Sequence, residues 1–136
     1  MKKTLNTIAL LLAVAIIGTV GVFNYIADDM CGNEIHKEYL SPNGSLKAVV
    51  FQRDCGATTG YSSQISILDA NEKLGNEAGN IFIIKDDPKS VAPILEWKSD
   101  TQLHIQYELN GREFKAQNSF GWFDAVEIVY NNELKL

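Results

Sequence analysis

The sequence is poor in the residues that most enzyme and metal sites need, with two histidines and two cysteines among 136 residues. A catalytic thiolate needs a positioned base, usually histidine, and neither His36 nor His104 lies in a cysteine–histidine signature. A zinc site needs four ligands. Cys31, His36 and Cys55 supply three, at a spacing that matches no zinc motif. We therefore predict no catalytic residue, no cofactor and no metal site.

Clusters of basic side chains are also missing. Beyond Lys2 and Lys3 the chain has 10 Lys and Arg residues against 17 Asp and Glu, a net charge of −7. Nucleic acids and anionic membrane surfaces are bound through clustered Lys and Arg. Neither is expected as a partner of this part of the chain.

What the sequence does have is one long apolar run, because residues 4–27 contain no charged side chain. As a helix they would measure about 36 Å, which is enough for the roughly 30 Å hydrocarbon core of a bilayer. A secretory signal has an apolar centre of only about 7–15 residues and a small-residue cleavage site. We therefore favour an uncleaved single-pass anchor, and a cleaved signal is the alternative.

The charges on either side of this run indicate its orientation. Lys2 and Lys3 precede it and two aspartates follow it, and the excess of basic residues stays on the cytoplasmic side. We expect single-pass insertion into the inner (cytoplasmic) membrane, with the C-terminal domain in the periplasm or outside. The expected parts are a cytoplasmic tail (residues 1–3), an anchor (4–27), a linker (28–40) and a β domain outside the cytoplasm (41–136).

Both cysteines lie in the exported part, where an oxidising compartment lets a disulfide persist. Only one pairing is possible, Cys31 with Cys55, and it closes a loop of about 25 residues, worth roughly 3 kcal/mol on the chain-entropy model. This disulfide would tie the segment that leaves the membrane to the first strand of the domain.

The remaining sequence reads as short strands with no amphipathic helical window. Residues 46–53 are apolar on both faces, which is typical of a strand covered on both sides. Residues 61–69 alternate and predict a hairpin with 46–53 across a long loop. Residues 103–109 alternate most regularly, and Asn110-Gly111 predicts a hairpin to the strand that begins at Arg112.

These patterns predict an all-β domain, a small antiparallel sandwich or open barrel of six to seven short strands, preceded by one N-terminal transmembrane helix. The expected core residues are Val49, Phe51, Ile65, Ile67, Phe82, Ile84, Leu95, Trp97, Leu103, Ile105, Tyr107 and Ile128. For the aromatic stretch SFGWF, residues 119–123, we favour core packing over an exposed contact patch, since aromatic side chains serve both roles.

One stretch, RDCGATTGYSS at residues 53–63, combines a cysteine with glycines and hydroxyl side chains. Two interpretations are open. It forms a corner of the fold, with Cys55 as a disulfide anchor, or a polar binding loop, since binding residues concentrate on loops. The candidate binding-loop residues are Arg53, Asp54, Thr58, Thr59 and Tyr61.

The segment SPNGSLKAVVFQRDCGATTGYSSQISIL, with Cys31 before it, resembles a family of small bacterial membrane-anchored envelope proteins. Their pattern is approximately Ser-Pro-Asp-Gly-Lys, two positions, Ala-Val-Val-Phe, one position, Arg-Asp-Cys-Gly-Ala-Thr-Thr. The present chain has Asn43 in place of Asp and Ser45 in place of Lys. The resemblance implies an envelope location and a β fold, and it implies no particular activity.

We therefore expect a non-catalytic binding or interaction module of the envelope, for example an inhibitor- or immunity-like one, with an envelope protein or a glycan as partner. The alternative is a small hydrolase or a thiol-dependent enzyme.

Overall fold

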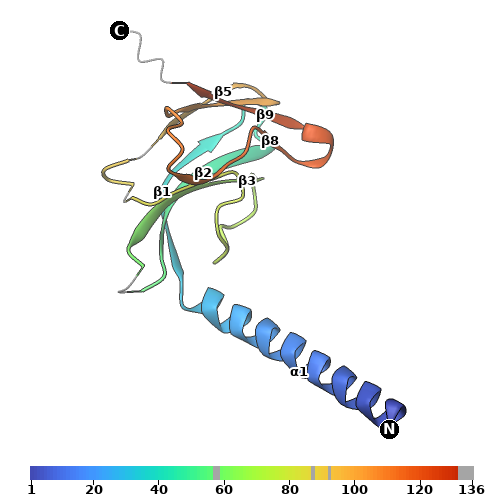
Figure 1. Ribbon diagram of the computed structural model, residues 1–136. Helices are drawn as coiled ribbons and strands as arrows, with labels where there is room; N and C mark the ends of the chain where they lie inside the picture. Colours follow the sequence, from blue (N-terminus) through green and yellow to red (C-terminus); the bar gives the residue numbers. More distant parts are fainter. Residues whose placement is uncertain (57–58, 87, 92, 132–136) are drawn as a thin grey trace.

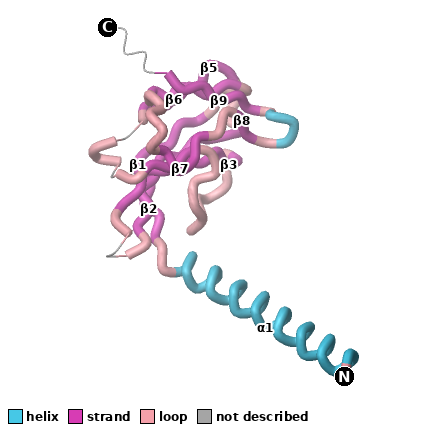
Figure 2. The backbone as a smooth tube through the Cα atoms, in the orientation of Figure 1, coloured by secondary structure: helices cyan, strands magenta, loops and turns pink. Residues whose placement is uncertain are grey.

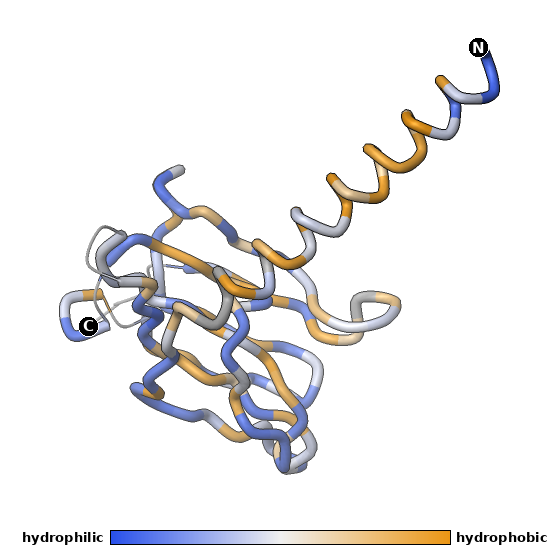
Figure 3. The backbone as a smooth tube through the Cα atoms, turned by 90° about the horizontal axis from the view of Figure 1, so that it is seen from below, coloured by the Kyte–Doolittle hydropathy of each residue, from blue (hydrophilic) through white to orange (hydrophobic). Residues whose placement is uncertain are grey.

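In the computed structural model of the protein, a single helix precedes a β domain (Figure 1). The structure describes residues 1–56, 59–86, 88–91 and 93–131. Helix α1 (Lys2–Asp29) is long and apolar enough to cross a membrane over Lys2–Phe23, and a signal sequence has the same properties. Within this span the side chains are not buried by the domain, and Figure 3 shows hydrophobic residues along most of the length of the helix.

The described residues of the domain form nine strands in two sheets, as the expected all-β class requires (Figure 2). The first sheet has the order β1-β2-β3-β4-β7. Its strands are β1 (Gly32–Leu40), β2 (Leu46–Asp54), β3 (Tyr61–Asp69), β4 (Phe82–Ile84) and β7 (Glu113–Ala116). The second has the order β5-β6-β9-β8. Its strands are β5 (Ile94–Ser99), β6 (Gln102–Gln106), β9 (Val126–Asn131) and β8 (Ser119–Phe120), and a short 3-10 turn, η1 (Trp122–Asp124), links β8 to β9.

Three local expectations need correction. The part of the expected linker after Met30 contains β1, a nine-residue strand that pairs with β2. The sequence indicated a polar linker with room for only a short strand at its end, because most of the side chains of β1 are exposed at the edge of the sheet and show no apolar alternation. The strands number nine in the described residues rather than six or seven, and β6 pairs with β9 in parallel, so the domain is not purely antiparallel.

The hairpin expected at Asn110-Gly111 is wrong. Strand β6 ends at Gln106, and β7 pairs with β4 in the other sheet. The Glu113 carboxylate accepts the backbone N–H of Asn110 and of Gly111, each at 3.0 Å. Gly111 has φ 80°, a conformation that suits glycine. The turn exists, but it moves the chain from one sheet to the other, where β7 covers the free edge of β4.

The core lies between the two sheets. Ten of the twelve expected core residues are buried, and Trp97 and Tyr107 are partly buried against the same cluster. The Nε1–H of Trp97 donates to the carbonyl of Tyr39 at 2.9 Å, which satisfies its polar atom. Val49 and Phe51 are fully buried, yet they are not part of the inter-sheet cluster, since alternate residues of β2 face opposite sides.

The loop between β3 and β4 covers this second face. Arg53 donates to the carbonyl of Asn76 at 2.8 Å, and the amide of Asn33 donates to the carbonyls of Gly75 and Glu77 at 2.9 and 2.7 Å. Closer to β4, the N–H of Gly79 bonds to the side chain of Gln64. The expectation that β2 is covered on both sides is confirmed: the second sheet covers one face and this loop the other.

Candidate functional site

Cys31 and Cys55 form a disulfide, as expected. The register of β1 and β2 explains the pairing, because Gly32 lies opposite Asp54. One step further along the ladder brings the two cysteines opposite each other. Only Met30 and Cys31 separate α1 from β1, so the disulfide fixes the junction between helix and domain to the end of β2.

The structure places the candidate loop residues in different roles. Arg53 is buried, with 5% of its surface exposed, and it also donates to the Asn33 side chain at 2.9 Å. The Asp54 carboxylate accepts the N–H of Gly56 at 2.9 Å, and the Thr59 hydroxyl donates to the carbonyl of Gly56 at 3.2 Å. Thr58 lies outside the described residues. These contacts shape the corner where β2 ends.

Beside this corner lies a groove of about 340 Å³, here called the Tyr61 groove. The loop and the start of β3 contribute Thr59 and Tyr61, and the last strands of the sheet contribute Ile83, Lys85 and Phe114. Tyr61 and Phe114 are 49% and 73% exposed. The volume of the Tyr61 groove is in the range of small-molecule pockets, about 300–1,000 Å³. Sequence patterns did not indicate Ile83, Lys85 and Phe114, because only the pairing of β3 with β4 and of β4 with β7 brings them here.

A second feature is the turn between β8 and β9, here called the Trp122 turn (Trp122 and Phe123). The preference for core packing holds for Phe120, which packs against the core cluster. It is wrong for Trp122 and Phe123, which are 89% and 99% exposed. Gly121 has φ 90°, and there the chain turns outward, so the two aromatic side chains leave the sheet. Figure 2 shows this turn projecting from the domain.

The backbone of the Trp122 turn is strained. Phe123 has φ 57° and ψ 35°, and it is the one non-glycine residue with positive φ in the described part of the chain. A bulky residue in this left-handed region is uncommon, and such strain concentrates at functional sites. The turn therefore holds an aromatic residue in solvent at a conformational cost.

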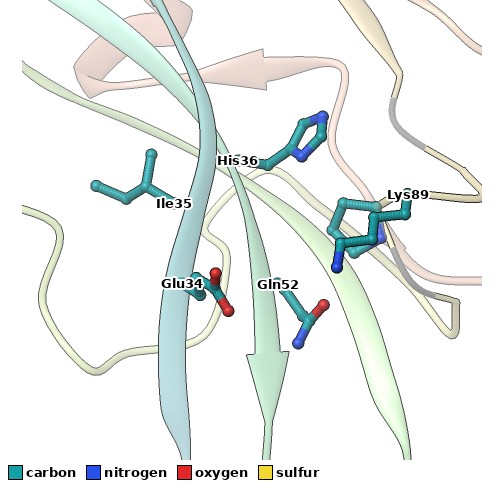
Figure 4. Close-up of a pocket in the computed structure, with 6 residues that line it drawn as sticks. Glu34, Ile35, His36, Gln52 and Lys89 are labelled. Carbon is teal, nitrogen blue, oxygen red and sulfur yellow. The ribbon is translucent and has the colours of Figure 1, made fainter.

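A small cavity of about 40 Å³ lies at the bulge of β1. Glu34, His36, Gln52 and Lys89 surround it, and Figure 4 shows Ile35 on the other side of the strand from His36. No group of three or more metal-binding side chains occurs within the described residues. The cavity has room for about one water molecule, and we assign it no ligand.

The shifted pKa values belong to groups beside the two segments that enter and leave β7. Hydrogen bonds from the backbone, chiefly from Asn110, lower the pKa of Glu113. Burial and the neighbouring Glu113 carboxylate raise the pKa of Tyr107, and burial raises the pKa of Tyr130. The Tyr130 hydroxyl donates to the carbonyl of Gln117 at 2.8 Å. These groups stabilise the crossing between the sheets, and none of them lines the Tyr61 groove.

No protein-family model, no curated protein and no solved structure matches the chain. The resemblance to small envelope proteins stays a prediction, and any function has to be inferred from the residues of this chain.

Proposed function

We propose that the protein is a single-pass membrane protein of the bacterial envelope. Its N-terminus lies in the cytoplasm and its domain outside, and the domain is a non-catalytic interaction module. The length of α1, the lysines before it and the disulfide after it support this location. Both cysteine thiols are used in the disulfide, which removes the nucleophile that a thiol enzyme needs.

The observation that carries the interaction proposal is the Trp122 turn. Tryptophan is enriched among the residues that dominate binding energy at protein interfaces, and apolar side chains that are exposed side by side as one patch mark interaction sites. Here two adjacent ones are almost fully exposed. The partner we propose is another envelope protein with an apolar pocket that receives these side chains, as an inhibitor or immunity protein would use a protruding loop.

The size of the expected effect follows from the anchor role. An interface anchor contributes about 2 kcal/mol or more, which corresponds to roughly a 30-fold change in Kd. Trp122→Ala should therefore weaken the complex at least about 30-fold, while the domain keeps its stability because the side chain contacts little of it.

Photocrosslinking in living cells tests the proposal. A benzophenone amino acid is introduced at position 123 of the full chain, and the same probe at position 98, on the exposed Lys98, is the control. We expect a specific protein adduct from position 123 that disappears when Trp122→Ala is added. An adduct that resists protease and is removed by glycosidase, or equal adducts from both positions, would contradict the protein-partner proposal.

A further inference from the structure

We propose that the Tyr61 groove binds a phospholipid of the bilayer that α1 spans, with the acyl part against the aromatic rim and the phosphate at Lys85. This proposal rests on the membrane anchoring proposed above and is independent of the Trp122 turn. It assigns the candidate binding loop a ligand of a different class from the protein partner.

The groove lies close to the end of α1. Only two residues separate the end of α1 from Gly32, and two extended residues span about 7 Å. Gly32 pairs with Asp54, and Asp54 pairs with Tyr61. The end of the sheet that carries the groove is therefore the end joined to the helix. Figures 1 and 2 agree, since α1 leaves the domain at the end that carries the loop between β2 and β3.

The next strands keep the groove at this end. Ser63 pairs with Ile84, so the position after β4, occupied by Lys85, lies beside Ser62 near the start of β3. Phe114 belongs to β7, whose residue Glu113 pairs with Ile84. The span of α1 that can cross a membrane ends at Phe23, six residues before the helix ends at Asp29, so in a bilayer the groove lies at the end of the domain that is nearest to the lipid surface.

The chemistry of the groove also suits a lipid. The groove combines two partly exposed aromatic rings, an aliphatic side chain, an exposed lysine and the hydroxyl groups of Thr59 and Ser62, and the buried Arg53 and the disulfide-bonded Cys55 also line it. Aromatic residues with amphipathic rings are enriched at membrane interfaces, and lysine places its ammonium at the head-group level while its stem contacts apolar groups. Met30, 71% exposed, adds apolar surface at the same junction.

Charge narrows the choice of ligand. The exported part carries −7, so attraction to an anionic lipid surface does not drive the contact. Near the groove, the Asp54 carboxylate is bonded to the N–H of Gly56 and the Glu113 carboxylate to the turn before β7. Lys85 is the exposed basic side chain among the groove residues. A zwitterionic phospholipid supplies one phosphate for it and an apolar chain for the rings, so binding should persist at high salt.

The test uses the full chain in nanodiscs of phosphatidylcholine, with bromine on the acyl chains as a quencher of tryptophan fluorescence. The chain has two tryptophans, Trp97 and Trp122. The groove probe is Phe114→Trp in a chain that also carries Trp122→Phe. The control chain carries Trp122→Phe alone and reports only Trp97. We expect brominated lipid to reduce the emission of the groove probe well below that of the control chain, at low and high salt.

Two further samples separate the outcomes. In the unmodified chain, brominated lipid should leave the emission of Trp122 unchanged, because the Trp122 turn contacts a protein rather than lipid. Lys85→Ala added to the groove probe should reduce the quenching. Unquenched groove emission in a chain that the nanodisc retains would overturn the lipid site and leave the anchor intact.

Other outcomes also overturn the proposal. Equal quenching of the groove probe and of Trp122 would mean that the whole domain lies on the lipid without a specific site. A covalent dimer from a benzophenone at position 114 would show that a second copy fills the groove. Failure of the nanodisc to retain the chain would contradict the membrane anchoring, and with it the lipid site, without affecting the Trp122 turn.

Discussion

The backbone at Phe123 provides the sharpest test of the Trp122 turn. Its φ of 57° and ψ of 35° lie in the left-handed region, which costs an L-residue about 1–2 kcal/mol. The side chain is 99% exposed, so packing within the domain does not offset this cost. A partner that buries the ring would offset it.

Replacing Phe123 with glycine removes the clash of Cβ with the backbone, because glycine populates this region freely. Glycine also has more conformational freedom in the unfolded chain, which subtracts about 0.5–1 kcal/mol. The expected net gain in the free energy of unfolding is about 0.5–1 kcal/mol. Phe123→Ala keeps Cβ and the strained φ, so it should leave the free energy of unfolding nearly unchanged. The difference between the two variants isolates the contribution of the backbone.

The assay is thermal unfolding of the full chain in detergent micelles, followed by the near-ultraviolet circular dichroism of the tryptophans. Trp97 packs against the core and reports on the β domain. A gain of about 0.5–1 kcal/mol should raise the Tm of Phe123→Gly by several degrees. Both variants should lose the partner in binding assays, because both lack the aromatic ring.

Two results would refute this reasoning. A lower Tm for Phe123→Gly would show that the backbone is not strained at this position. A loss of more than about 1 kcal/mol in Phe123→Ala would show that the ring packs on the domain, since exposed side chains usually contribute less than about 0.5 kcal/mol. Either result would remove the reason to think that the turn is held in its conformation for a partner.

Three further predictions concern the frame of the domain. Gly79→Ala places its Cβ 2.8 Å from the carbonyl oxygen of Phe82 and should destabilise the domain by about 1–3 kcal/mol. Gly75→Ala is the matched control in the same unfolding assay, because a Cβ there has nothing within 4 Å. Equal effects of the two substitutions would contradict the steric explanation. Replacing Cys31 and Cys55 together by serine should cost about 3 kcal/mol, and an unchanged urea midpoint would show that the junction needs no covalent tie. The pKa of Glu113 is lowered in the fold, so its carboxylate adds to the free energy of unfolding above its unfolded pKa of about 4.3, and this stabilisation is lost as pH falls through the folded pKa. Glu113→Gln should therefore make Tm depend less on pH in the acid range. An unaltered acid dependence of Tm would rule out this role.

Sequence patterns predicted the strands that lie in the core, since alternation reports which side chains share a face. Residues 46–53 nearly coincide with β2, and residues 61–69 coincide with β3. Alternation of apolar and polar residues along a strand does not indicate which other strand pairs with it, because strand pairing is set by contacts between segments far apart in the sequence. After β6 the chain therefore crosses to the other sheet, where β7 pairs with β4, and β9 takes the place beside β6. The Tyr61 groove depends on those pairings, and for this reason three of its nine lining residues, Ile83, Lys85 and Phe114, were missed.

The Trp122 turn was missed for a different reason. Tryptophan and phenylalanine are usually buried on average, and that tendency favours core packing for residues 119–123. It holds for Phe120 of β8, which packs against the core cluster. One residue later Gly121 has φ 90°, and nothing in the composition of the stretch indicates that a glycine there turns the following aromatic residues into solvent.

The RDCGATTGYSS stretch contains residues that shape the fold and exposed residues of the Tyr61 groove. Arg53 is buried and tied to two segments, Asp54 shapes the following turn, and Cys55 is oxidised. The Nη1 of Arg53 donates to Asn33 and Asn76, and removing one partner of a buried charged network costs about 3–5 kcal/mol, so Arg53 is a fixed part of the groove lining. Thr59 and Tyr61 are exposed, and together with Arg53 and Cys55 they line the groove at the end of the sheet joined to α1. The corner and the groove therefore share residues of one motif, and we infer that its buried residues hold Thr59 and Tyr61 in place for the proposed ligand.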